Sequence, residues 1–176
     1  MTELAKIDIL GEKSLQRRMV HVSLVPLAAG AAAVALLFAA GAAERPSLAW
    51  LAALVALALT VLPAHELVHA AAFKLLVAGC RVSFEARSWC VATNAHGALM
   101  GRGAALAVLL SPLVLVTLAL ACGCASAGCP ALAVAEAALH ASGCAGDALM
   151  AAEVLRERSC THVRDTDYGI DLLKEE

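Results

Sequence analysis

Three ionisable side chains stand close together inside an apolar stretch of the chain: His65, Glu66 and His69. They form the pattern HExxH in the segment "HELVHAAAFKLL". Residues four apart share one face of a helix, so His65 and His69 can bind one zinc ion through imidazole nitrogens. Glu66 lies beside them and can take a proton from a water whose pKa the metal lowers toward neutrality. The pattern therefore predicts a zinc site with Glu66 as the catalytic residue.

The composition around this pattern is typical of a membrane-embedded chain. Of the 176 residues, 61% are apolar and only 16% are charged, whereas soluble proteins carry about 25% charged residues. An ionisable group at the centre of a bilayer costs on the order of 2.5 to 3.5 kcal/mol on insertion scales and normally marks function. A structural role, with hydrogen bonds to the backbone, could explain one of the three groups. It explains the trio poorly, so we favour a metal site.

Four stretches reach the roughly 20 apolar residues that a membrane-spanning helix needs. We expect these helices at about residues 22–43, 48–78, 103–122 and 130–155. Pro63 predicts a bend in the second helix, and the abundance of small residues favours close packing between helices. The predicted organisation is an N-terminal arm (1–21), a membrane domain (22–155) and a C-terminal tail (156–176).

The connection between the second and third helices differs from the rest of the chain. Its segment "RVSFEARSW" alternates apolar and polar residues, and "CVAT" follows as a candidate partner. We expect a short β-hairpin here, around Arg81 to Thr93, with an irregular polar loop as the alternative. The predicted fold class is therefore an all-α membrane protein with about four transmembrane helices and a short cytoplasmic hairpin.

The basic residues orient the predicted bundle. They gather in the N-terminal arm, in the segment between the second and third helices and in the tail: Lys6, Lys13, Arg17, Arg18, Arg81, Arg87, Arg102, Arg156, Arg158, Arg164 and Lys174. The other two connections hold only Arg45. Because cytoplasmic loops are enriched in Lys and Arg, we expect a multi-pass protein of the cell membrane with both termini in the cytoplasm.

A catalytic zinc site needs a third protein ligand and keeps one position for water. The glycine and third histidine of the metzincin extension do not follow His69, which excludes that class. Asp147 lies as far into the fourth helix, counted from Pro130, as His65 lies into the second, counted from Leu48. Both helices enter from the same side, so Asp147 is the predicted third ligand. Other acidic residues lie at other depths or in the polar segment: Glu85, Glu136 and Glu153.

The neighbours of Asp147 in "HASGCAGDALM" bear on this choice. Gly143 and Gly146 would let another helix or a metal approach the backbone closely. His140 and Cys144 fall on the same helical face as Asp147. Either could hydrogen-bond to the ligands or replace Asp147 as the third ligand, although such residues more often pack within a bundle.

An HExxH in one membrane helix with an aspartate in a later helix is similar to the site-2 protease group of intramembrane metalloproteases. More closely, the order "HELVHAAAFKLL", polar hairpin, "LLSPLVL", "ASGCAGDALM" and "VRDTDYGIDL" resembles a family of small zincin peptidases, known mainly as a domain of unknown function. This resemblance runs from Leu62 to Leu173. It implies one Zn²⁺ per chain, with Glu66 as base and three ligands: His65, His69 and Asp147.

Three further features bear on this interpretation. Site-2 proteases carry their aspartate with a nearby asparagine and proline, which "SGCAGD" lacks. Asp165 falls where the small zincin family tends to carry an acid, but a solvated charge in the tail is its default interpretation. The seven cysteines include "CGCASAGC", which could ligate metal or form disulfides but lacks the paired spacing of a zinc ribbon.

The predicted function is a zinc-dependent integral-membrane metallopeptidase that cleaves membrane proteins or membrane-associated peptides by intramembrane proteolysis. The substrate would be held extended, by strand addition to an edge of the hairpin. Two other functions stay open: a metal carrier or sensor that uses the histidines, Asp147 and the cysteines, and a non-catalytic membrane adaptor. A nucleic-acid partner is not expected, since no basic run is interleaved with aromatic residues.

Overall fold

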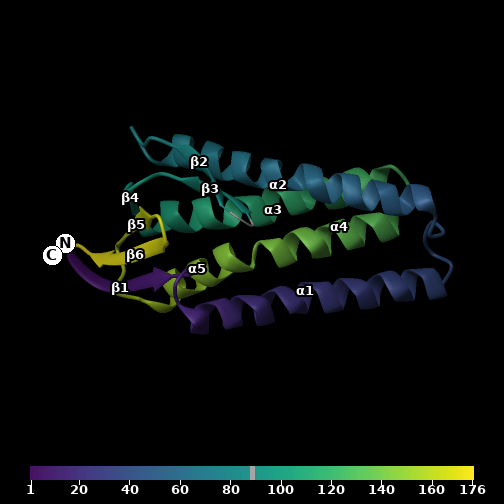
Figure 1. Cartoon of the computed structure of the whole chain (residues 1–176), viewed down its shortest axis with the longest axis horizontal. Coiled ribbons are helices and arrows are strands. Elements are labelled where there is room, and N and C mark those ends of the chain that lie inside the picture. Colours follow the sequence, from purple (N-terminus) through teal and green to yellow (C-terminus); the bar gives the residue numbers. More distant parts are fainter. Residues whose placement is uncertain (88–89) are drawn as a thin grey trace.

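The computed structural model describes residues 1–87 and 90–176 and is mostly helical. Its helices are α1 (Lys13–Ala39), α2 (Leu48–Leu76), α3 (Arg102–Ser126), α4 (Pro130–Gly143) and α5 (Ala145–Arg156). They run lengthwise beside one another, with a small sheet and both chain termini at one end (Figure 1). The site discussed below lies where α2, α3 and the junction of α4 and α5 meet.

Three helices in the described part of the chain are long and apolar enough to cross a membrane: α1, α2 and α3. The bounds of all three differ from the expected ones, most of all at the start of α1. α1 begins at Lys13 rather than at Val22, because the basic residues that precede the apolar run are themselves helical. α2 continues as a helix through Pro63. At 29 residues it measures about 44 Å, longer than the apolar core of a bilayer.

The expected fourth span is not one helix. The chain turns at Cys144, so that α4 has 14 residues and α5 has 12, each shorter than the roughly 20 residues of a single span. Backbone hydrogen bonds continue across the turn, from Cys144 N to His140 O and from Ala148 N to Cys144 O. The two helices therefore form one bent rod, and the bend directs α5 toward the sheet (Figure 1).

The all-α class is wrong in one respect, because the two ends of the chain fold together into a sheet. Strands β1 (Thr2–Asp8), β4 (Leu99–Gly101), β5 (His162–Thr166) and β6 (Gly169–Lys174) form an antiparallel sheet in the order β1-β6-β5-β4. Its buried residues include Val163, Ile170 and Leu172, which belong to the main core together with residues of α3 and α5. The predicted arm and tail are thus parts of one structure.

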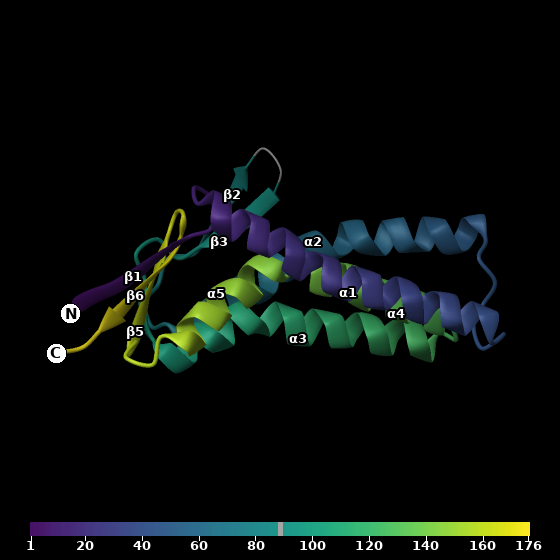
Figure 2. The ribbon, with the colours of Figure 1, turned by 90° about the horizontal axis from the view of Figure 1, so that it is seen from below.

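A separate two-stranded hairpin lies between α2 and α3. Its strands are β2 (Ser83–Arg87) and β3 (Cys90–Asn94), paired antiparallel. The turn of the expected hairpin, at 88–89, lies outside the described residues. Seen from below, the hairpin stands out from the side of the bundle (Figure 2). The alternating sequence predicted a hairpin around Arg81 to Thr93, between the same two helices. That the hairpin lies on the cytoplasmic side of the membrane stays a prediction.

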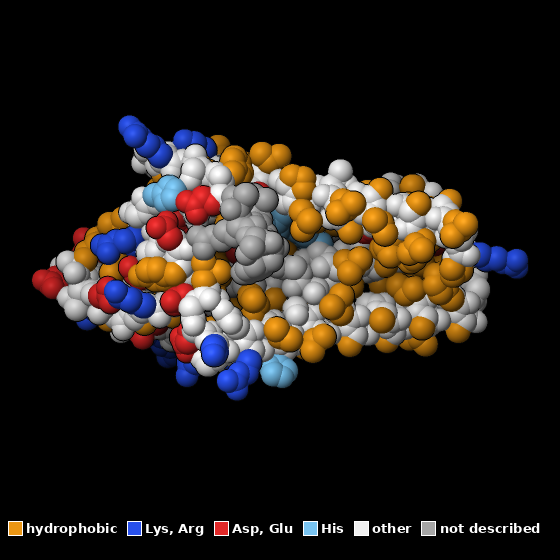
Figure 3. All heavy atoms as spheres, viewed as in Figure 1, with side chains coloured by type: hydrophobic (Ala, Val, Ile, Leu, Met, Phe, Trp, Pro, Cys, Tyr) orange, Lys and Arg blue, Asp and Glu red, His pale blue; other side chains and the backbone are white. Residues whose placement is uncertain are grey.

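Charged and apolar side chains are separated along the long axis of the molecule. On the face shown in Figure 3, acidic and basic side chains gather around the sheet, while hydrophobic side chains cover most of the helices. Many large apolar residues of the helices are exposed, among them Val25, Leu36, Leu59 and Leu118. Such a band would be costly in water and is suited to lipid.

Small residues bring two helices close together, as their abundance predicted. A Cβ added at Gly30 on α1 would collide with the Cβ of Ala138 on α4. Glu44, in the connection before α2, also joins these parts: its carboxylate accepts hydrogen bonds from Leu132 N at 2.9 Å and from Trp50 Nε1 at 2.8 Å. These contacts hold α4, and with it the bend at Cys144, against the neighbouring helices.

Candidate metal centre

The structure brings together the three residues predicted to hold zinc. His65 and His69 lie one turn apart on α2, and Asp147 is in the first turn of α5. Asp147 Oδ2 lies 3.2 Å from His65 Nε2 and 3.4 Å from His69 Nε2. The two Nε2 atoms are 3.1 Å apart. All three side chains are at most 16% exposed, so three polar atoms converge in a largely buried place.

These distances fit the geometry of a zinc site. Zinc bonds to imidazole nitrogen or carboxylate oxygen measure about 2.0–2.2 Å, so ligand atoms at the corners of a tetrahedron lie about 3.3–3.6 Å apart. The observed separations of 3.1, 3.2 and 3.4 Å approach this spacing. Two imidazoles and one carboxylate are also a ligand set of catalytic zinc sites. The residues present therefore fit the metal that the pattern predicts.

His69 is held in the orientation that such a site requires. Its Nδ1 lies 3.0 Å from the backbone oxygen of Val108 on α3. The carbonyl can only accept, so Nδ1 carries the proton and Nε2 keeps its lone pair for a metal. In a regular helix this oxygen would bond to the backbone N–H four residues later, but that residue is Pro112, which has none. Pro112 thus leaves the Val108 oxygen available to His69.

His65 is oriented through a chain of side chains. Its Nδ1 lies 3.2 Å from His140 Nε2, and His140 Nδ1 lies 2.8 Å from Thr117 Oγ1. If His65 donates from Nδ1, its Nε2 is free for a metal, and His140 in turn donates to the Thr117 hydroxyl. The structure therefore places His140 on the side of the His65 ring that faces away from His69 and Asp147. A hydrogen bond from His140 to a predicted ligand was one of the two alternatives for this residue.

Glu66 is fastened to the hairpin. Its Oε2 accepts a hydrogen bond of 2.7 Å from the backbone N–H of Thr93, and its backbone oxygen accepts one of 3.0 Å from the Thr93 hydroxyl. Glu66 and Thr93 line a cavity of about 240 Å³ together with the three predicted ligands. The hairpin thus forms one wall of the site and fixes the carboxylate beside the histidines.

Asp165 also lines this cavity. Its Oδ2 accepts a hydrogen bond of 2.7 Å from the backbone N–H of Ala95, just after β3. Burial raises the pKa of the Asp165 carboxyl to about 6. The default interpretation as a solvated tail charge is wrong, since this residue ties β5 to the segment that follows the hairpin.

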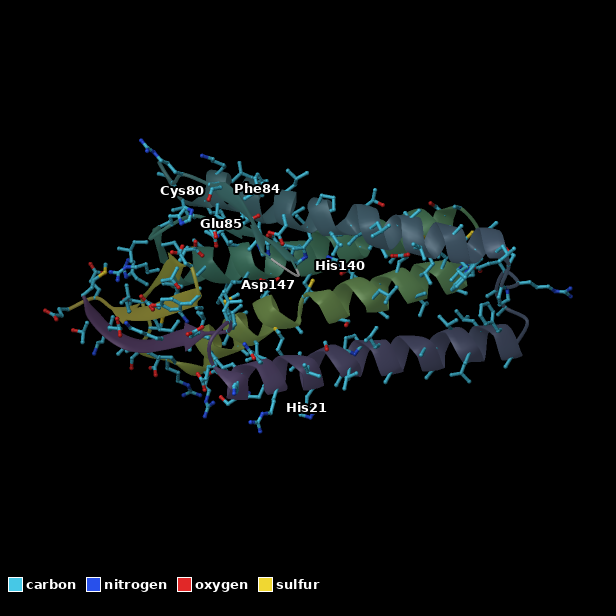
Figure 4. All side chains as sticks on the ribbon, in the orientation of Figure 1. His21, Cys80, Phe84, Glu85, His140 and Asp147 are labelled. Carbon is cyan, nitrogen blue, oxygen red and sulfur yellow. The ribbon has the colours of Figure 1, made fainter. Side chains whose placement is uncertain are left out.

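Figure 4 shows His140 and Asp147 close together near the middle of the bundle, on either side of the bend between α4 and α5. The nearby glycines do not serve a close approach of another helix. A Cβ at Gly143 would meet no described atom within 4 Å, and one at Gly146 would make only ordinary contacts with Met19 and Ile9. The bend itself, rather than a close approach at these glycines, brings Asp147 toward α2.

Sequence reasoning missed three supporting residues: Pro112, Thr117 and Thr93. A signal existed only for Pro112, because a proline inside an apolar helix leaves the carbonyl four residues earlier without its usual partner. Thr117 and Thr93 act through contacts between segments far apart in the chain, which no local pattern reveals. The six cysteines whose side chains the structure describes are free thiols, so no disulfide forms among them.

Fold and site together define a mostly helical protein with membrane-length helices and a buried group of metal-ligating side chains. Residues 58–161, more than half of the chain, match the model of a family described as "Putative zincin peptidase". The chain belongs to this family, as its sequence motifs suggested. Searches of curated proteins and of solved structures return no match. The likeness to site-2 proteases stays a prediction.

Replacing Pro112 by alanine should weaken zinc binding. The new alanine would supply an N–H to the Val108 oxygen, which would then compete with His69 Nδ1 for it. Loss of such a supporting hydrogen bond typically lowers metal affinity about 10–100-fold. Competition with a chromophoric chelator measures the affinity in detergent.

Pro26→Ala is the matched control, since Pro26 also lies inside a long apolar helix but on α1, which supplies no ligand. We expect the control to bind zinc as the wild type does. Equal affinities of Pro112→Ala and wild type would contradict the role of the Val108 carbonyl.

Proposed function

We propose that the protein is a zinc-dependent membrane metallopeptidase of the zincin class. One observation carries this proposal: His65 Nε2, His69 Nε2 and Asp147 Oδ2 converge within 3.4 Å of one another, on the α2 face beside Glu66. The family supports a peptidase that uses zinc. A scaffold would have no need for three converging ligand atoms together with an adjacent carboxylate.

In this mechanism the three ligands hold the ion, and Glu66 moves the proton. When bound, zinc acts as a Lewis acid on the scissile carbonyl and lowers the pKa of a water in its open position. Glu66 accepts the proton of the attacking water and returns it to the leaving amine. The hydrogen bond from Thr93 N fixes one oxygen of the carboxylate and leaves the other free to carry the proton.

We propose membrane proteins or membrane-associated peptides as substrates. Cleavage requires an extended backbone, because helical hydrogen bonds shield the peptide groups. The hairpin is the natural place to hold such a segment, since β3 already touches Glu66 and a strand can add to an exposed sheet edge. A substrate strand there would lie within reach of both the metal ligands and the base.

We further propose that both termini and the hairpin face the cytoplasm. The sheet end of the molecule carries both ends of the chain, and eight of the 13 Lys and Arg residues lie in residues 1–21 and 156–176. The positive-inside rule then places this end in the cytoplasm of a cell membrane. Site and hairpin would lie toward that side.

A tag fused to the C-terminus tests this orientation. In sealed inside-out vesicles of the cell membrane, added protease should remove the tag, because the cytoplasmic face is outside. In right-side-out vesicles the tag should survive until detergent opens them. A tag that survives in inside-out vesicles and is removed in intact right-side-out vesicles would contradict the proposed orientation.

Glu66→Gln separates a peptidase from a metal carrier. It removes the base but keeps every predicted ligand, so we expect cleavage of a quenched-fluorescence peptide library in detergent micelles to fall by at least about 100-fold. Zinc content should not change. A carrier would not need Glu66, and an adaptor would hold no stoichiometric zinc.

Glu153→Gln is the control, because Glu153 lies on α5 and pairs with Arg18, away from the ligands. It should retain cleavage. Full activity of Glu66→Gln beside an active wild type would overturn the proposed mechanism.

A further inference from the structure

His65 has a second group of ligand atoms on its other side. Its Nδ1 lies 3.2 Å from His140 Nε2 and 3.7 Å from Cys144 Sγ. Cys144 Sγ is 3.6 Å from His140 Nε2, which closes a triangle. The three residues come from α2, from α4 and from the bend that follows α4. Cys144 is 1% exposed and His140 is 6% exposed.

The triangle has the dimensions of a zinc site with sulfur. With bonds of about 2.0–2.1 Å to nitrogen and 2.3 Å to sulfur, tetrahedral ligand atoms lie about 3.3 Å apart between nitrogens and about 3.5–3.6 Å apart between nitrogen and sulfur. The observed values of 3.2, 3.6 and 3.7 Å are close to these. Three donor atoms of the right types thus meet, and the peptidase mechanism uses none of these three atoms as a ligand.

We propose that His65 Nδ1, His140 Nε2 and Cys144 Sγ form a second metal position, behind the zinc site. Two imidazoles and a thiolate suit thiophilic or borderline ions, zinc and Cu(I) among them. Binding deprotonates the thiol, so one proton leaves as the metal enters. This site does not depend on peptide hydrolysis, and its test needs no substrate.

The two positions exclude each other, because a neutral imidazole has one lone pair. With a metal at the first position, His65 uses Nε2 as ligand and donates from Nδ1 to His140. With a metal at the second, Nδ1 is the ligand, and Nε2–H donates to Asp147, 3.2 Å away. In each state one ring nitrogen of His65 binds the metal and the other donates a hydrogen bond. A shift of the ring proton therefore accompanies transfer of the ion from one side of His65 to the other.

Cobalt(II) substitution distinguishes the two positions, because thiolate ligation adds a sulfur-to-cobalt charge-transfer absorption in the near ultraviolet. In the wild type we expect one cobalt ion per chain at the first position, without this absorption. Asp147→Ala removes a ligand of the first position only. The ion should then bind at the second position, still at one per chain, and the absorption should appear.

Two double variants make the test specific. Adding Cys144→Ser to Asp147→Ala should abolish the new absorption, whereas adding Cys124→Ser, which removes another buried thiol on α3, should leave it. If Asp147→Ala does not fold, Asp147→Asn replaces it with the same expectation. Cobalt binding without the absorption, or no cobalt binding in a folded Asp147 variant, would overturn the second position. Neither result bears on the peptidase proposal, which Glu66→Gln tests.

Discussion

The structure depends on one constraint: polar groups inside an apolar bundle must be satisfied by one another. His65, His69 and Asp147 are largely buried among helices whose outer surface is suited to lipid. Each would be costly there alone. Their mutual distances of 3.1–3.4 Å let His65 donate from Nε2 to the carboxylate when no ion is bound and let all three share an ion when one is. The same arrangement serves stability and metal binding.

Departures from regular helix geometry create this arrangement. Pro112 removes a donor from α3 and so provides His69 with the Val108 carbonyl. The bend at Cys144 turns α5 so that Asp147 reaches the α2 histidines, and it leaves His140 on the far side of His65. A straight fourth helix would present a single face to α2. The bend instead surrounds His65 with ligand atoms on two sides.

The sequence predicts the parts of this protein that rest on local patterns. Long apolar runs indicated three helices that the structure also has, and HExxH placed two histidines on one helix face. Comparing depths along two helices singled out Asp147, which the structure brings to those histidines. The pairing of β1 with β6 could not be predicted, because it joins the two ends of the chain and depends on contacts formed only after folding. The bend at Cys144 has no proline, but Ser142 and Gly143 just before it are a local signal that the prediction of one straight helix overlooked, because helices often kink at Gly/Ser pairs.

The central claim is that His65, His69 and Asp147 hold zinc beside Glu66. X-ray absorption at the zinc edge, on purified wild-type protein, tests it most directly because it reports the ligand atoms themselves. We predict one zinc ion per chain with two imidazole nitrogens and oxygen in its first shell, and no sulfur. Protein without stoichiometric zinc, or zinc bound through sulfur, would contradict the assignment.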